Sequence, residues 1–377
     1  MSAPDAENSP LSLLLAIPRL NHRTGRRRWG ALPREMPDPI KGRYDGGWLM
    51  IVITGGGGFI GSNLAAALED RGAGDLVICD ALGAEGKWRN IAKREIAAFI
   101  QPERLFDFLD ANAGDIDAIF HMGAISATTE TDADRLIRSN FTLSLDLWEW
   151  CARHDSRLIY ASSAATYGDG TAGFDDEFST AALARLKPMN AYGWSKHLFD
   201  RRIARNLENG APAPRQWVGL KFFNVYGPNE YHKGPQQSVV AQIYPVAKRD
   251  GTARLFKSHD PDYPDGGQLR DFVWVEDCAN VMAWLFDHPE VSGLFNMGTG
   301  KARSFADLAR AVFAALGKEA NIDYVDTPDE IREKYQYFTE AKMDRLRAAG
   351  YDNPFTAIEE GVGRYVRDYL DTDDPYR

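Results

Sequence analysis

The stretch MIVITGGGGFIGSNLAAALEDRG, residues 50–72, decides the fold of this chain. Its apolar run Met50–Ile53 is typical of a strand that is covered on both faces, as in a parallel sheet. Gly55, Gly58 and Gly61 follow with the spacing GxxGxxG, and a helical segment comes after them. The first two glycines permit a tight turn and close approach to a pyrophosphate, and the third permits the helix to pack on the strand. We therefore expect a dinucleotide to bind where the backbone N–H groups of the helix begin.

A second strand-like segment, DLVICDA, ends at Asp80 and argues against a mere tight turn. An acidic residue about 20 positions after the glycines holds a ribose hydroxyl in dinucleotide-binding folds. Asp80 favours NAD, because a carboxylate repels the 2′-phosphate of NADP. Lys87, Arg89 and Lys93 follow closely and are able to neutralise that phosphate. The chemistry of these residues leaves NAD and NADP open.

Strand-like and helical segments continue to alternate along the chain. Further strands are predicted within residues 118–124, 157–168 and 216–227. Such alternation predicts an α/β fold, a doubly wound parallel sheet of the Rossmann type with right-handed crossovers. Ligands of these sheets bind at the carboxyl ends of the strands. Ser126, Ser163 and Asn224 lie just past such ends, so we expect them in the cofactor cleft.

The segment NAYGWSKHLFD, residues 190–200, places Tyr192 and Lys196 four residues apart on a predicted helix. Residues at i and i+4 share one helix face. Taken alone, such a pair is more often a surface tyrosine beside a solvated lysine. Beside a dinucleotide cleft, an ammonium that stabilises a phenolate would lower the tyrosine pKa from about 10 toward neutrality. We therefore predict Tyr192 as a general acid/base.

Bulk composition excludes several classes of protein. The 54 acidic and 44 basic residues give a net charge of −10, which argues against a nucleic-acid partner. Cys79, Cys151 and Cys278 form no CxxC pair, so neither a metal site nor a disulfide is expected, and a cytoplasmic location fits best. No apolar run approaches the roughly 20 residues of a membrane span, so no membrane association is expected.

The two ends of the chain differ from this central part. Residues 1–49 hold six prolines and the cluster Arg26–Arg28, and we predict a disordered extension rather than a basic tether. We assign residues 50–222 to a dinucleotide-binding domain to which 271–300 return. Residues 223–270 and 301–377 are assigned to a smaller C-terminal α/β substrate domain. The stretch 221–257 is locally basic, which suits a phosphate-bearing substrate as well as an ordinary solvated surface.

Five motifs occur along the chain in this order: TGGGGFIG, YASSAATYG, YGWSK, FNVYGP and RDFVWVEDCA. Together they resemble the extended short-chain dehydrogenases/reductases over roughly residues 50–370. More narrowly, FFNVYGPNEYHKG and KYQYFTEAKMDRLRAAGYDNPF resemble the ADP-glycero-manno-heptose 6-epimerase group of that family. The resemblance implies an NADP-dependent isomerase of lipopolysaccharide core biosynthesis, with NAD possible, that acts on an ADP-sugar. It also implies a homo-oligomer, a pentamer if the chain follows the family.

The resemblance assigns roles to individual residues. It implies catalytic roles for Tyr192, Lys196, Ser163 and Lys233. The implied cofactor contacts are Gly55, Gly58, Phe59, Ile60, Gly61, Asp80, Lys87, Ser126, Lys196 and Val225. The implied substrate contacts are Asn224, Gln242, Phe256, Arg270 and Tyr335. Three positions depart from the family pattern: Pro235 replaces a frequent serine, Pro102 a cofactor-side lysine, and Met122 a common glutamate.

The implied reaction explains a need for two proton-transfer groups. Oxidation at C6″ gives a ketone, which must turn before the hydride returns to its other face. Its oxygen then meets a different proton donor, so we expect Tyr192 to serve one orientation and Lys233 the other. Alternatives are another nucleotide-sugar epimerase, such as a 4-epimerase, or a non-catalytic dinucleotide-binding regulator. A 4,6-dehydratase is disfavoured because Ala164 and Ala165, not an acid, follow Ser163.

Overall fold

The computed structural model describes residues 49–328, 332 and 336–377. All of them belong to one compact unit, Pro39–Arg377. The predicted extension over residues 1–49 falls, except for Leu49, outside the described residues, and so does Tyr335. Among the described residues, no helix has the length and apolar character needed to cross a bilayer.

Seven parallel strands form the main sheet, in the order β10–β6–β5–β4–β1–β2–β3. Their bounds are β1 (Met50–Thr54), β2 (Asp75–Cys79), β3 (Ala98–Ile100), β4 (Ile116–His121), β5 (Arg157–Ser163), β6 (Trp217–Phe222) and β10 (Gly293–Met297). The order places β1 in the interior of the sheet, between β4 and β2. The predicted doubly wound parallel sheet is confirmed.

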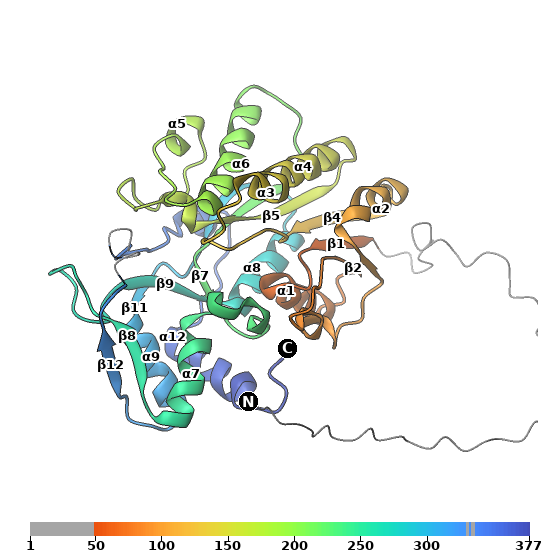
Figure 1. Ribbon diagram of the computed structural model, residues 1–377. Coiled ribbons are helices and arrows are strands. Elements are labelled where there is room, and N and C mark those ends of the chain that lie inside the picture. The colour runs from red at the N-terminus through yellow and green to blue at the C-terminus, as the bar shows by residue number, and fades with distance from the viewer. Residues whose placement is uncertain (1–48, 329–331, 333–335) are drawn as a thin grey trace, which may run out of the picture. The chain divides into compact units, whose positions relative to one another are not determined.

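Helices cover both faces of this sheet because its strands are apolar on both faces. In β1, Ile51 and Ile53 pack toward α1 (Phe59–Asp70) and α8 (Val275–Asp287). Met50 and Val52 pack toward the opposite layer. That layer contains α2 (Leu105–Ala111), α4 (Leu143–Arg153) and α6 (Ala191–Glu208). Figure 1 shows the layer with α4 and α6 above the sheet and the layer with α1 and α8 below it.

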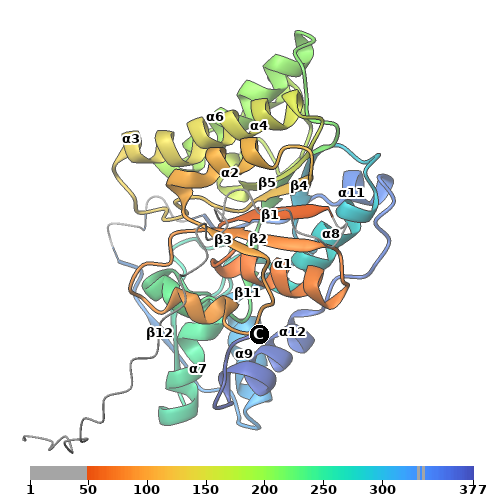
Figure 2. The same cartoon turned by 90° about the vertical axis from the view of Figure 1, so that its right-hand side faces the viewer.

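A smaller lobe has its own core. Its sheets are β11 (Ala302–Ser304)–β9 (Leu269–Trp274)–β7 (Asn224–Tyr226) and β12 (Ile322–Val325)–β8 (Ala253–Phe256). Its helices are α7 (Val239–Asp250), α9 (Phe305–Ala315) and α12 (Ile358–Tyr365), which group together in Figure 2. Buried Val240, Trp274, Leu308 and Tyr365 join these elements in one apolar cluster. The α/β character predicted for the C-terminal part is confirmed.

Shorter elements connect these layers. They are α3 (Ala133–Leu136), α5 (Thr180–Leu183), α11 (Asp344–Ala348), η1 (Lys87–Ile91), η2 (Pro102–Arg104), η3 (Ile137–Thr142), η4 (Ala164–Tyr167), η5 (Tyr231–Gln236) and η6 (Val366–Leu370). Of these, η3 and η6 are π-helical and the other η elements are 3₁₀ turns.

The prediction of one strand within residues 216–227 is wrong in one respect. β6 ends at Phe222 in the large sheet, and β7 starts at Asn224 in the small one. At the break, the Phe223 N–H donates to the carbonyl oxygen of Met297, 3.0 Å away. The predicted boundary between residues 222 and 223 lies at this break. Within the predicted returning segment, β9 belongs to the small sheet, whereas α8 packs on α1 and β10 joins the large sheet. The domain boundaries as a whole stay a prediction.

Candidate active site

The glycine-rich turn joins β1 to α1 and passes so close to the end of β4 that Gly55 has no room for a side chain. Gly55 has φ of +67°, and a Cβ on it would lie 2.5 Å from the backbone nitrogen of Gly123. A Cβ on Gly61 would lie 2.3 Å from the carbonyl oxygen of Gly55. Gly58, the N-cap of α1, has no side chain to cap the helix. The turn thus leaves a bare backbone cradle at a helix N-terminus, which fits a pyrophosphate.

Asp80 and Lys87 form an ion pair beside this cradle. The Lys87 Nζ lies 2.6 Å from Asp80 Oδ1. The other carboxylate oxygen accepts a hydrogen bond of 2.8 Å from the Gly57 N–H. The Asn90 side chain donates to the Gly57 carbonyl oxygen at 2.9 Å. The acid that sequence reasoning placed at the ribose is therefore tied to the cradle and carries a cation beside it.

A cavity of about 310 Å³ at the carboxyl edge of the sheet gathers most of the predicted site. The predicted residues that line it are Gly55, Gly58, Phe59, Ile60, Gly61, Asp80, Lys87, Ser126, Ser163, Tyr192, Lys196, Val225 and Lys233. Residues that sequence reasoning missed, Phe222, Phe223 and His232 among them, complete the lining.

Tyr192 and Lys196 lie in the first turns of α6, which Asn190 caps by accepting a hydrogen bond of 2.8 Å from the Gly193 N–H. The Lys196 Nζ donates to the carbonyl oxygen of Ala161 in β5, 2.8 Å away. Burial lowers the pKa of Lys196 to about 8, and nearby Asp200 works in the opposite direction. Lys196 is therefore a buried ammonium with a fixed position at the strand end.

The predicted depression of the Tyr192 pKa is wrong for the chain by itself. Burial raises the pKa of Tyr192, whereas its hydrogen bond with Ser163 lowers the pKa by a smaller amount. The physical reason is that removing a phenolate from water disfavours the charged form. In this arrangement the hydroxyl of Tyr192 stays protonated, and Ser163 is its partner.

A buried ion pair lies beneath Tyr192 and Lys196. Asp200 follows Lys196 by one further turn of α6 and is 3.6 Å from the Nζ of Lys221 in β6, both side chains being fully buried. The Ser162 Oγ donates to Asp200 at 2.7 Å, and Lys221 donates to the Oγ1 of Thr166 at 2.8 Å. These bonds fix the end of β5, and with it Ser163, against α6.

Asn140 is a buried polar residue that sequence reasoning missed. It lies in the π-helical turn Ile137–Thr142. Its amide exchanges two hydrogen bonds of 2.9 Å with the backbone of Ile125 and donates to the Ser195 Oγ at 3.0 Å. Asn140 therefore joins α6 to the loop that carries Ser126. A lone asparagine on the buried face of an amphipathic helix was the signal for it.

Lys233 approaches the cavity from η5, on the side of the smaller lobe. Its Nζ lies 5.0 Å from the ring centroid of Phe59, at the start of α1. Burial lowers the pKa of Lys233, and Glu230 opposes that shift. Glu230 is itself fully buried and accepts hydrogen bonds from the N–H and Oγ of Ser238 and from the Tyr365 hydroxyl.

The predicted substrate residues divide between two further cavities. One of about 600 Å³ shares Ser163 and Tyr192 with the first cavity and adds Asn224 and Arg270. The Arg270 guanidinium donates to the carbonyl oxygens of Leu269 and Gln336. The shared residues make this cavity the continuation of the first.

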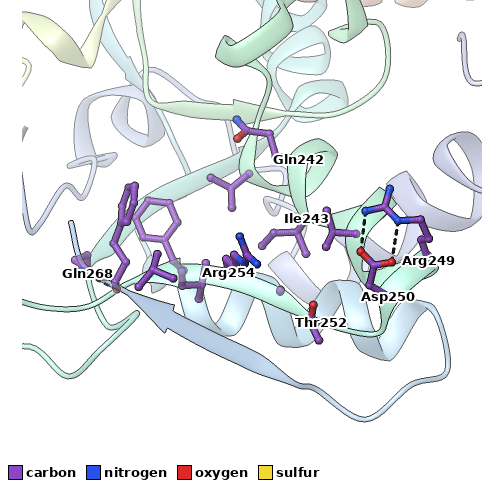
Figure 3. Close-up of a pocket in the computed structure, with 14 residues that line it drawn as sticks. Gln242, Ile243, Arg249, Asp250, Thr252, Arg254 and Gln268 are labelled. Atoms are coloured by element: carbon purple, nitrogen blue, oxygen red, sulfur yellow. Dashed lines mark hydrogen bonds and ion pairs between the residues drawn. The ribbon is translucent and has the colours of Figure 1, made fainter. Parts of the chain in front are cut away.

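The other cavity, of about 630 Å³, lies between α7 and β8 and is lined by Gln242 and Phe256 (Figure 3). Figure 3 shows Arg249 paired with Asp250 at one end and the Gln242 side chain extending away from Arg254. The Gln242 amide donates to the carbonyl oxygens of Pro235 and Gln237 instead. Gln242 thus joins this cavity to the segment that follows Lys233.

Comparisons with known proteins agree with this geometry. The model of the NAD dependent epimerase/dehydratase family matches residues 51–298. The ADP-L-glycero-D-manno-heptose-6-epimerase of Nitratidesulfovibrio vulgaris (strain DP4) is 48% identical over 329 residues, which cover 87% of this chain and all of the relative. The enzyme of that name from Fusobacterium nucleatum is 45% identical over 335 residues, with 87% and 100% coverage.

A solved structure gives the same indication. The crystal structure of Helicobacter pylori ADP-L-glycero-D-manno-heptose-6-epimerase has a TM-score of 0.71 and 27% identity, covering 88% of this chain and 98% of that one. The family model spans the cradle, the Tyr192 helix and Lys233, and it carries a nicotinamide dinucleotide requirement in its description. The chain belongs to the NAD dependent epimerase/dehydratase family and, within it, to the ADP-L-glycero-D-manno-heptose-6-epimerases.

Proposed function

We propose that this chain inverts C6″ of ADP-glycero-manno-heptose by transient oxidation and re-reduction with a bound NADP. One observation carries the proposal. A single cavity is lined by the glycine-rich cradle, the Tyr192–Lys196 pair and Lys233, so the two groups to which we assign proton transfer come from separate elements and line one cavity. An epimerase that reorients its substrate needs such a pair, because the oxygen at the inverted carbon faces a different direction in each half of the cycle.

The cradle of Gly55, Gly58 and Gly61 would hold the pyrophosphate, and Lys196 the ribose beside the nicotinamide. When bound there, a nicotinamide dinucleotide would supply the hydride acceptor and donor that inversion at C6″ requires. We favour NADP over NAD because Lys87 lies against Asp80 and offsets the charge that would repel a 2′-phosphate. If NAD binds instead, Asp80 holds the 2′-hydroxyl.

Tyr192 and Lys233 would move the protons. In one orientation the Tyr192 Oη exchanges a proton with the C6″ oxygen, with Ser163 holding that oxygen in place. In the other orientation the Lys233 Nζ takes this role. Burial lowers the pKa of Lys233, which brings its ammonium closer to the range where it can give up a proton.

The ADP-sugar would extend from this centre into the smaller lobe. Asn224 and Arg270 line the adjoining cavity, and Phe256 lines the cavity beside α7. Arg254 gives that cavity a cationic group, which suits a diphosphate, whereas Arg249 is paired with Asp250. The ADP-sugar named by the relatives supports this assignment. We also propose a cytoplasmic location, which three buried cysteines without a disulfide fit. We also propose that the protein is a homo-oligomer, a pentamer if the chain follows its family. Light scattering measures the mass of the assembly and so tests this proposal.

The test begins with the cofactor and ends with the substrate. The purified protein is denatured, and the released dinucleotide is identified against NAD and NADP standards. The native protein is then incubated with ADP-D-glycero-D-manno-heptose, and the C6″ proton is followed by NMR. Formation of the L-glycero epimer supports the proposal. Turnover only of a UDP-hexose at C4″ would replace it with a 4-epimerase, and cofactor binding with no turnover of either would indicate a regulator.

A further inference from the structure

The loop that carries Lys233 is fastened to the nucleotide-binding lobe. We call residues 228–233 the lysine loop. The Asn63 side chain donates to the carbonyl oxygen of Pro228 at 3.0 Å, and the Asn229 side chain donates to the Ser62 Oγ at 3.0 Å. Asn90, which also bonds to the glycine-rich turn, lies 3.2 Å from the Nδ1 of His232. One side of the lysine loop therefore rests on α1 and η1.

The last six residues of the chain hold the same loop from the other side. We call Thr372–Arg377 the tail. The Tyr231 hydroxyl donates to the carbonyl oxygen of Pro375 at 2.8 Å, and the rings of Tyr231 and Tyr376 meet edge to face at 5.3 Å. The Arg377 N–H donates to the Asn229 Oδ1 at 3.0 Å. Both side-chain ends of the Asn229 amide are thus used, one toward α1 and the other toward the tail.

The tail is anchored at both of its ends. Just before it, Asp371 accepts hydrogen bonds from Tyr244 and Lys248 of α7. At its far end, Lys93 binds the Asp374 carboxylate at 2.7 Å and the Tyr376 carbonyl oxygen, and Arg377 lies 3.5 Å from Asp70 of α1. Figure 1 places the C-terminus near α1 in agreement with these contacts. The tail therefore crosses from the smaller lobe to the nucleotide-binding lobe over the lysine loop.

The lysine loop needs such support because its own backbone does not define it strongly. Asn229 has φ of +71°, a left-handed conformation that is uncommon for non-glycine residues, although asparagine adopts it more readily than most. Gly234, with φ of +53°, interrupts the 3₁₀ turn directly after Lys233. Short 3₁₀ turns have poor hydrogen-bond geometry and little stability of their own. The position of Lys233 is thus set by contacts from outside the loop.

From these contacts we infer that the tail is a positioning element for Lys233, holding the lysine loop at the distance from the cradle at which its ammonium reaches the substrate. The inference rests on the role proposed for Lys233. Single exposed ion pairs such as Lys93–Asp374 contribute little. We attribute to them an effect that they exert jointly with the Tyr231 and Asn229 bonds, in addition to the contacts of the loop with α1 and η1.

The experiment removes the tail with a stop codon after Asp371 and combines this truncation with Lys233→Met in a double-mutant cycle. In the wild-type background, we expect truncation to lower kcat by about tenfold while the cofactor stays bound. This loss is smaller than the full contribution of a general acid/base, because Lys233 is displaced but still present. In the Lys233→Met background, truncation should change kcat by less than about twofold, because coupled residues are non-additive. Equal losses in both backgrounds would overturn the inference, since the tail would then act on the whole fold.

Hydrogen exchange separates this inference from the proposed function. Truncation should raise amide exchange within residues 228–236 and leave α6 unchanged. If amide exchange within residues 228–236 does not rise, the tail does not hold the lysine loop, independently of the role of Lys233. If exchange rises while Lys233→Met alone keeps the wild-type rate, the two-base function fails and the anchoring stands. Lys93→Met should give part of the truncation effect, whereas Lys342→Met, which breaks the surface pair with Asp175 far from the tail, should give none.

Discussion

Tyr192 and Lys233 line the same cavity from two regions that are built differently. Tyr192 lies in an 18-residue helix whose N-cap, Asn190, is two residues away, and its partner Lys196 is on the same helix face. Lys233 lies in a short 3₁₀ turn that is held by residues more than a hundred positions away in the sequence. The comparison teaches that one proton-transfer group is placed by local helix geometry and the other by tertiary contacts.

The largest losses of kcat should come from replacing Tyr192 or Lys233. Tyr192→Phe and Lys233→Met should each lower kcat by about 10²–10⁴-fold while the fold and bound cofactor remain, since each removes one proton-transfer group. The double variant should lose much less than the product, because the groups act in one cycle. Single-turnover NMR with ADP-heptose measures this. A wild-type rate for Lys233→Met would break the comparison, because Tyr192 would then serve alone or with another group.

The buried acids behind the two groups should differ in their effect on stability. Asp200→Asn leaves Lys221 as an uncompensated buried charge and should reduce the free energy of unfolding by about 3–5 kcal/mol. Glu230→Gln keeps one acceptor oxygen, which can serve the Ser238 and Tyr365 hydroxyls but not the Ser238 N–H as well, and should cost about 1–3 kcal/mol. Urea denaturation of both variants gives the two values. If Glu230→Gln is the more destabilising, the lysine loop is built more firmly than we propose.

The helix that carries Tyr192 and Lys196 should also respond to pH. Because burial lowers the pKa of Lys196 to about 8, its positive charge is present below pH 8 and is lost above it. Reloading of cofactor-stripped protein with dinucleotide should therefore weaken above pH 8, by roughly tenfold per pH unit. Lys196→Arg remains charged at these pH values and should not show this fall. Constant affinity from pH 7 to 9.5 in the wild type would contradict the role given to Lys196.

The smallest effect should come from the helix cap next to Tyr192. Asn190→Ala removes the acceptor for the Gly193 N–H and should cost about 1 kcal/mol of stability. Asn190→Asp keeps an acceptor and serves as the matched variant. Thermal melts of both proteins measure the difference. A loss of kcat in Asn190→Ala far beyond this cost would show that the cap positions the tyrosine, which would bring the two regions closer in character.

The same contrast explains what could be predicted from the sequence. The cradle, Asp80 and the Tyr192–Lys196 pair depend on spacings within about 25 residues, so they could be derived from pattern and chemistry. Lys233 could be assigned only through family resemblance, because nothing near it in the sequence marks a cavity. Asn140 and Glu230 were missed, since their partners come from other elements.

Two further features depended on the tertiary structure. The pKa of Tyr192 was predicted with the wrong sign, because its burial depends on how α6 packs. The strand break at Phe223 has only a weak local signal, Asn224, because Phe222, Phe223 and Val225 all favour strands.

That break has a mechanical consequence. Phe223 alone separates a strand of the large sheet from a strand of the small one: Phe222 is paired with Ser163, and Asn224 with Phe272. The chain therefore passes from one sheet to the other directly beside Ser163. A displacement of one sheet relative to the other would be transmitted through this single residue to Ser163 and Asn224, which line the same cavity.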